Sequence, residues 1–196
     1  MTITGVNLRT FHGKMLAACV VIFAAQILVA PKPDFIAIGA LYGPDVVAGQ
    51  WWRIFSAGFL HASITHLGLN MLSLYILGRP LEMLVDRAGR WAFPTLYLGS
   101  LVGGSLGAMI LEYDVPSVGA SGAIFGLLGA AIVIPQRLGM GWNGFGVAPW
   151  LAVNLVFTFI QPNISRGGHL GGLVAGLGIG AVLASLLRNR GDHPTL

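Results

Sequence analysis

Residues 168–187 read GHLGGLVAGLGIGAVLASLL and carry no charged side chain. A helix of about 20 apolar residues is long enough to cross the hydrocarbon core of a bilayer, which is about 30 Å thick. The stretch therefore predicts a transmembrane helix. Its glycines recur every four residues, at Gly168, Gly172, Gly176 and Gly180. Small residues at this spacing let helix backbones approach closely in lipid, so the helix is expected to pack against neighbours through its glycine face.

Five further apolar runs precede this stretch. They cover residues 15–30, 64–84, 91–111, 121–137 and 147–162. Turn-forming or charged residues separate them, for example between Asp114 and Pro116. The chain is therefore expected to form an all-α membrane protein, a single bundle of six transmembrane helices. A secretory signal peptide is the alternative interpretation of the first run, but Pro31 directly after Ala30 makes a poor cleavage site.

The composition excludes an ordinary soluble protein and a nucleic-acid binder. Of the 196 residues, 55% are hydrophobic and only 9% are charged, whereas soluble domains carry about 25% charged residues. The formal net charge of +4 is expected to orient the chain in the membrane, and no nucleic-acid partner is expected. Cys19 is the only cysteine and lies in an apolar run. No disulfide framework, metal site or cofactor is therefore expected.

Two other predicted spans carry the same spacing of small residues. These residues are Gly99, Gly103 and Gly107 in the third span and Gly122, Gly126 and Ala130 in the fourth. We therefore expect the third, fourth and sixth spans to lie against one another.

Most basic residues fall on one side of the predicted bundle. Eight of the eleven lie at the chain ends and in the second and fourth loops: Arg9, Lys14, Arg79, Arg87, Arg90, Arg137, Arg188 and Arg190. The opposite side holds Lys32, Arg53 and Arg166. Because cytoplasmic loops carry the excess of lysine and arginine, both termini are expected in the cytoplasm and the chain in the plasma membrane. The expected division is a cytoplasmic segment 1–14, a membrane domain 15–187 and a cytoplasmic tail 188–196.

The first outer loop, at about 31–60, is long and apolar and contains Trp51, Trp52 and Arg53. Tryptophan is enriched where membrane meets water. This loop is therefore expected to lie laterally in the interface.

Four polar residues stand at similar depth in three predicted spans. They are His66, Asn70, Ser121 and His169. All three spans start from the outer side, so these residues are expected beneath one face. The fourth span has about 17 residues and rises about 25 Å, which is less than the hydrocarbon thickness. Ser121 is therefore expected below the outer surface, at a helix N-terminus against a water-filled pocket.

A serine beside a histidine can carry out covalent acyl transfer, with the imidazole as general base. The acidic residues are expected in loops, at interfaces or in the tail, so none is a good third member: Asp34, Asp45, Glu82, Asp86, Glu112, Asp114 and Asp192. The expected machinery is thus a Ser121–His169 dyad, with His169 oriented by the ring of Phe125. The Ser121 backbone N–H, His66 and Asn70 are expected to stabilise an oxyanion.

Each polar residue also has a structural interpretation. A lone intramembrane serine usually bonds its own helix backbone, and His66 alone could join two helices. His61 is expected at the interface, and His12 and His193 in solvent.

Four motifs in order resemble those of the rhomboid intramembrane serine proteases, in the minimal six-span bacterial or archaeal form. They are Trp52-Arg53, His66-x-x-x-Asn70, Gly119-x-Ser121-Gly122 and His169-x-x-Gly172-x-x-x-Gly176. The resemblance covers about residues 15–187. It implies Ser121 as nucleophile, His169 as general base and His66, Asn70 and the Ser121 amide as oxyanion contacts. It also implies a lateral first loop in which Arg53 is tied to Glu82. Phe125 departs from the tyrosine, and Gly168 from the alanine, found in other members.

The resemblance implies cleavage of single-span membrane proteins within or near their transmembrane segments, in the lipid bilayer. Two alternatives remain open. One is a catalytically silent relative that binds membrane helices. The other is a small transporter or channel using the polar pocket, although no inverted repeat and no mid-depth acidic residue is seen in the sequence.

Overall fold

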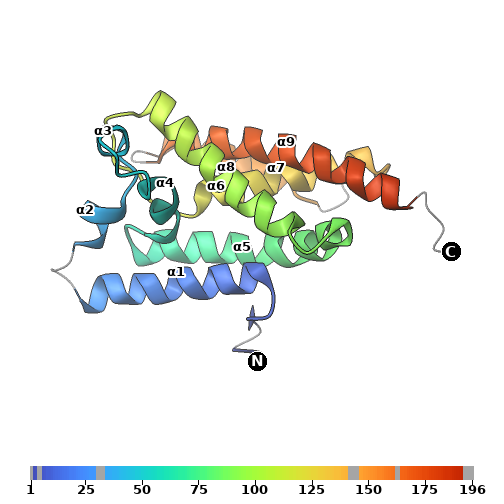
Figure 1. Ribbon diagram of the computed structural model, residues 1–196, viewed down its shortest axis with the longest axis horizontal. Coiled ribbons are helices and arrows are strands. Elements are labelled where there is room, and N and C mark those ends of the chain that lie inside the picture. The colour runs from blue at the N-terminus through green and yellow to red at the C-terminus, as the bar shows by residue number, and fades with distance from the viewer. Residues whose placement is uncertain (1, 4–5, 30–33, 141–145, 162–163, 192–196) are drawn as a thin grey trace.

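The computed structural model describes residues 2–3, 6–29, 34–140, 146–161 and 164–191. Long helices account for most of this part of the chain (Figure 1). They are α1 (Phe11–Leu28), α5 (Ile64–Val85), α6 (Ala92–Leu111), α7 (Ser121–Arg137), α8 (Ala148–Ile160) and α9 (Arg166–Gly191). The six predicted helical segments are thus confirmed within a few residues. The described residues do not include Pro31, Lys32, Pro162, Asp192 or His193, so the expectations for these positions lie outside the described part of the chain.

The helices differ in their ability to cross a membrane. Of the described helices, α1, α6 and α9 are long and apolar enough to span, and α5 with the short helices before it forms a possible fourth span bent by 94°. The apolar helices α7 and α8 have 17 and 13 residues. The shortness predicted for the fourth span is therefore confirmed.

Short elements fill the first loop and the chain start. The loop contains α2 (Phe35–Gly39), α3 (Gly43–Val47), α4 (Arg53–Ser56) and η1 (Ala57–Phe59), while η2 (Asp86–Ala88) follows α5. At the chain start, β1 (Thr2–Ile3) and β2 (Val6–Asn7) pair antiparallel, with Thr2 opposite Asn7. In Figure 1 the short helices α2, α3 and α4 lie toward the left, whereas α1 begins and α9 ends farther right.

Helix α7 lies at the centre of the packing. Twelve of its residues are buried, and its apolar side chains join one core with those of α5 and α6, including Leu74, Phe93 and Leu127. Ser121, the expected nucleophile, is therefore the first residue of a helix that is buried along most of its length.

Glycines bring the backbones of α6, α7 and α9 into direct contact, as predicted. A Cβ placed on Gly172 would overlap the carbonyl oxygen of Gly122, and one on Gly176 would overlap that of Gly126. On the α6 side, a Cβ on Gly107 would lie 2.9 Å from the Cα of Gly171. The three glycine rows are therefore packing surfaces.

Arg53 fastens the first loop, but not through the expected partner. Its guanidinium forms a 2.8 Å ion pair with Asp45 and donates to the carbonyl oxygens of Ala40 and Ala37 at 2.7 and 2.8 Å. Its Nε donates to Gln50 at 2.9 Å. The expected tie to Glu82 is wrong, because Asp45, Gln50 and two carbonyls of the same loop meet the guanidinium first.

Glu82 instead binds the start of α1. Its carboxylate accepts from the backbone N–H groups of Phe11 and His12 at 2.6 and 2.9 Å, and lies 2.6 Å from His12 Nδ1. A carboxylate at a helix N-terminus satisfies N–H groups that have no partner within the helix. The expectation that His12 is solvated is therefore wrong, since its side chain is buried in this contact. Glu82 also lies within α5 and is buried, not in a loop.

Replacing Arg53 by alanine should destabilise the fold by about 3 kcal/mol, because it removes several hydrogen bonds and leaves buried carbonyl oxygens without donors. The matched variant is Asp45→Asn, which removes the charge of a carboxylate that is 35% exposed and leaves the other three partners of Arg53 in place. Denaturant unfolding in detergent should show a large loss for Arg53→Ala and a small one for Asp45→Asn. Equal stabilities would contradict this role of Arg53.

Candidate active site

Ser121 is the first residue of α7, and its surroundings explain the sequence before it. Gly119 has a φ of 125°, a left-handed conformation that favours glycine. Ala120 is the N-cap of α7, and its methyl side chain forms no capping hydrogen bond. The N–H groups of the first turn therefore remain available, and the positive end of the helix dipole lies at Ser121.

A second reason for glycine at position 119 is the ring of His66. A Cβ on Gly119 would lie 2.7 Å from His66 Nε2 and 3.7 Å from Ser121 Oγ. His66 thus extends from α5 to the loop that precedes the serine. The structure brings His66, Gly119 and Ser121 together, as the sequence predicted.

His169 lies in the first turns of α9 and is 8% exposed. Its imidazole stacks on Phe125, with ring centroids 4.0 Å apart and an interplanar angle of 17°. The predicted stacking of Phe125 on His169 is confirmed. Within the described residues, no hydrogen bond joins Ser121 to His169. Catalytic hydrogen bonds are often long or poorly aligned in enzymes without substrate.

Asn70 is buried one turn after His66 on the same face of α5. Its Nδ2 donates to the backbone carbonyl of His66 at 3.0 Å. The amide group has a second N–H, and the described hydrogen bonds connect Asn70 to His66 and not to Ser121.

His61, which the sequence places at the depth of the membrane interface, is buried inside the bundle. It is 1% exposed, and its ring packs edge-on against His66 with centroids 5.1 Å apart. Gln26 of α1 holds the backbone there, because its side chain donates to the His61 carbonyl and accepts from the His61 N–H, both at 3.2 Å.

Two contacts of the His169 region were missed from the sequence. Glu112, at the end of α6, accepts from the Ser165 hydroxyl and from the Arg166 N–H at 2.7 Å, which fixes the first turn of α9. Thr158 of α8 lies 2.7 Å from His169 Nδ1 through its hydroxyl oxygen. Neither could be predicted from spacing, because each pairs residues of different helices.

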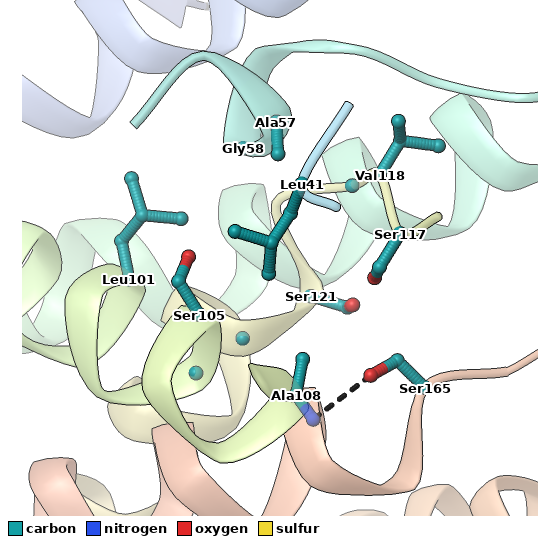
Figure 2. Close-up of a pocket in the computed structure, with 14 residues that line it drawn as sticks. Leu41, Ala57, Gly58, Leu101, Ser105, Ala108, Ser117, Val118, Ser121 and Ser165 are labelled. Atoms are coloured by element: carbon teal, nitrogen blue, oxygen red, sulfur yellow. Dashed lines mark hydrogen bonds between the residues drawn. The ribbon is translucent and has the colours of Figure 1, made fainter. Parts of the chain in front are cut away.

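A small cavity lies beside Ser121 (Figure 2). Its volume is about 30 Å³, which is enough for about one water molecule. Four serines line it, two from helices α6 and α7 and two from loops: Ser105, Ser121, Ser117 and Ser165. Leu41 of the first loop points into it in Figure 2, and the backbone of Leu41 pairs with Ser117.

The first loop places Trp52 at the edge of the bundle. Its indole N–H donates to the Ile38 carbonyl at 3.2 Å, and the residue is 44% exposed. This polar handle with an exposed apolar ring suits a membrane interface.

The apolar helices and their close packing define an integral multi-pass membrane protein. The family model described as "Rhomboid domain" matches residues 48–186, which is most of the chain. The chain belongs to the rhomboid family.

Curated relatives agree with this assignment. "Rhomboid protease GluP" of Bacillus subtilis (strain 168) is 34% identical over 151 residues, covering 76% of this chain and 29% of that protein. "Rhomboid-related protein 3" of Homo sapiens is 30% identical over 183 residues, covering 83% and 43%. "RHOMBOID-like protein 5" of Arabidopsis thaliana is 34% identical over 168 residues, covering 81% and 52%. The matches thus span between 29% and 52% of the length of these relatives.

Proposed function

We propose that this protein is an intramembrane serine endopeptidase that cleaves single-span membrane proteins within or near their transmembrane segments. The observation that carries the proposal is the pairing of α7 and α9. Ser121 starts one helix at an uncapped N-terminus, and His169, in the first turns of the other, stacks on Phe125 of α7. Family membership and the printed name of the bacterial relative support the same activity.

The proposed reaction uses Ser121 as nucleophile and His169 as general base. Ser121 Oγ bonds to the carbonyl carbon of the scissile peptide, and its proton passes to His169 Nε2. The imidazolium then protonates the amide nitrogen as the C–N bond breaks, which releases one product and leaves an acyl-enzyme. Water repeats the sequence and releases the second product. The polar cavity beside Ser121 suits that water.

The negative oxygen of the tetrahedral intermediate needs hydrogen-bond donors. The Ser121 N–H is the first candidate, since no side chain caps α7 among the described residues. His66 is the second, because its ring lies against Gly119. Asn70, with one amide N–H engaged by the His66 carbonyl, is the third.

We also propose the membrane arrangement. The membrane domain extends over residues 15–187 with six spans, both ends of the chain lie in the cytoplasm, and the plasma membrane is the host bilayer. The first loop lies laterally in the outer interface, a position consistent with the exposed ring of Trp52. Ser121 then lies below the outer surface, because α7 is short.

A panel of single-span substrates in liposomes tests the proposal. The purified protein should release two fragments, and mass spectrometry should place the cut in or near the transmembrane segment. A folded protein that binds these substrates without cutting any of them would favour the silent helix binder. Solute flux that survives Ser121→Ala would favour a transporter.

Replacing Asn70 by alanine should lower kcat by about 10²-fold, which is the effect of losing one oxyanion donor. Turnover should still exceed that of Ser121→Ala. The matched control is Ser73→Ala, a buried polar residue of the same helix, and it should remain close to wild type. Turnover is measured with a fluorogenic membrane substrate. A kcat for Asn70→Ala equal to that of the control would reduce Asn70 to a packing role.

A further inference from the structure

Thr158 is the one fully buried residue of α8, with 0% of its surface exposed. Its neighbours Phe157 and Phe159 are 49% and 52% exposed. A hydroxyl buried this deeply is costly unless it has hydrogen-bond partners. Thr158 Oγ1 has two, the backbone carbonyl of Asn154 and Nδ1 of His169, both at 2.7 Å.

The positions of the protons in these two contacts of Thr158 follow from counting donors and acceptors. A hydroxyl has one proton, and a carbonyl oxygen can only accept. If Thr158 donated to Nδ1, its oxygen and that of Asn154 would face each other at 2.7 Å with no proton between them. If Thr158 donates to Asn154, its lone pair accepts from an Nδ1–H of His169. Only the second arrangement makes both short contacts hydrogen bonds.

The Nδ1–H tautomer is the one that a general base at Nε2 requires. With the proton on Nδ1, the lone pair of Nε2 is free to accept the serine proton. The same Thr158 oxygen continues to accept from Nδ1–H when the ring becomes an imidazolium. We infer that Thr158 is a positioning residue that holds His169 in the reactive tautomer and orientation. This inference rests on the proposed peptidase function.

The stacked ring of Phe125 cannot supply this selection by itself. Stacking at 4.0 Å fixes the plane of the imidazole, but it does not determine which ring nitrogen carries the proton. A hydrogen bond at one nitrogen distinguishes them. Within the described residues no carboxylate bonds to His169, so Thr158 occupies the place that a carboxylate takes in a catalytic triad.

A pair of variants tests the hydroxyl against mere packing. Thr158→Val preserves the shape of the side chain and removes its oxygen, whereas Thr158→Ser keeps the oxygen. In liposomes with a single-span substrate, Thr158→Val should lower kcat about 10-fold, as expected for the loss of one hydrogen bond that orients a catalytic group. KM should not change, because Thr158 is not proposed to touch substrate. Thr158→Ser should recover most of the lost turnover.

The outcomes separate this inference from the proposed function. If the wild type is active and Thr158→Val has the same kcat, the role of Thr158 is overturned but the peptidase proposal is not. The same holds if Thr158→Ser is as slow as Thr158→Val. An inert wild type would overturn the peptidase proposal and this inference with it. Nitrogen NMR of histidine-labelled protein gives a readout independent of activity, with the His169 signals assigned by their loss in His169→Ala. The inference requires the Nδ1–H form, and a His169 protonated only on Nε2 would contradict it even in a variant that cleaves nothing.

Discussion

Replacing Ser121 by alanine should reduce cleavage of a single-span membrane substrate to background, a loss of about 10⁴-fold or more. His169→Ala should have a similar effect. Without the hydroxyl no acyl-enzyme forms, and without the imidazole no general base takes up the hydroxyl proton. Because the two side chains would act as one unit, the double variant should be no slower than either single variant.

The control for this series is Ser185→Ala. Ser185 lies on α9 and donates to the carbonyl of Ala181 one turn back, so it matches Ser121 in chemistry but lies far along the helix from His169. Its variant should cleave at the wild-type rate. Fragments are quantified by mass spectrometry in liposomes, and each variant is checked for folding by thermal unfolding. Cleavage by a folded Ser121→Ala or His169→Ala protein at more than a small fraction of the wild-type rate would exclude the mechanism.

Replacing Gly176 by leucine should prevent α7 and α9 from packing. Even a Cβ at this position would overlap the Gly126 backbone, and the overlapped atoms cannot turn away as a flexible side chain could. Forcing extra atoms into a packed contact usually costs about 1–3 kcal/mol. A whole side chain against backbone should exceed that range, so we expect a protein that unfolds or fails to accumulate.

Gly178→Leu is the matched control for Gly176→Leu. It makes the same chemical change two residues along α9, where nothing lies within 4 Å of an added Cβ. Leucine also has a higher helix propensity than glycine, by close to 1 kcal/mol. The control should therefore be at least as stable as wild type in detergent. Similar melting temperatures for the two variants would mean that α7 and α9 do not touch at Gly126 and Gly176.

Much of the helical architecture could be predicted from local properties of the sequence. The length and hydropathy of the apolar runs predicted the helices, and the four-residue spacing of glycines predicted the contacts among α6, α7 and α9. The apolar run 121–137 also predicted that α7 is short and starts at Ser121. These features are encoded within single segments, where hydrophobic length and helical period act directly.

The predictions that failed concern pairs of polar groups from different segments. Arg53 was expected to meet Glu82, but Asp45 and two carbonyls lie nearer along its own loop. His12 was expected in solvent, although Glu82 accepts from it in the structure. Spacing along the chain does not encode which of several polar groups will be closest after folding.

In the candidate site, too, features encoded within one segment could be predicted, whereas polar contacts between segments could not. The stacking of Phe125 on His169 could be predicted because both neighbouring helices carry a glycine row that fixes their register. Thr158 could not be predicted, since α8 has no such row and its only fully buried side chain is identified by tertiary contact. Of the two residues that contact the His169 ring in this way, Phe125 was predicted from the sequence and Thr158 was not.

The most direct test of an activated serine inside the membrane domain is covalent labelling. A fluorophosphonate probe reacts with a serine only when a neighbouring base removes its proton. Incubated with the folded wild-type protein and mapped by mass spectrometry, the probe should modify Ser121 and no other serine, and His169→Ala should abolish the modification. An unmodified Ser121 in folded wild-type protein, or equal labelling in His169→Ala, would contradict the account.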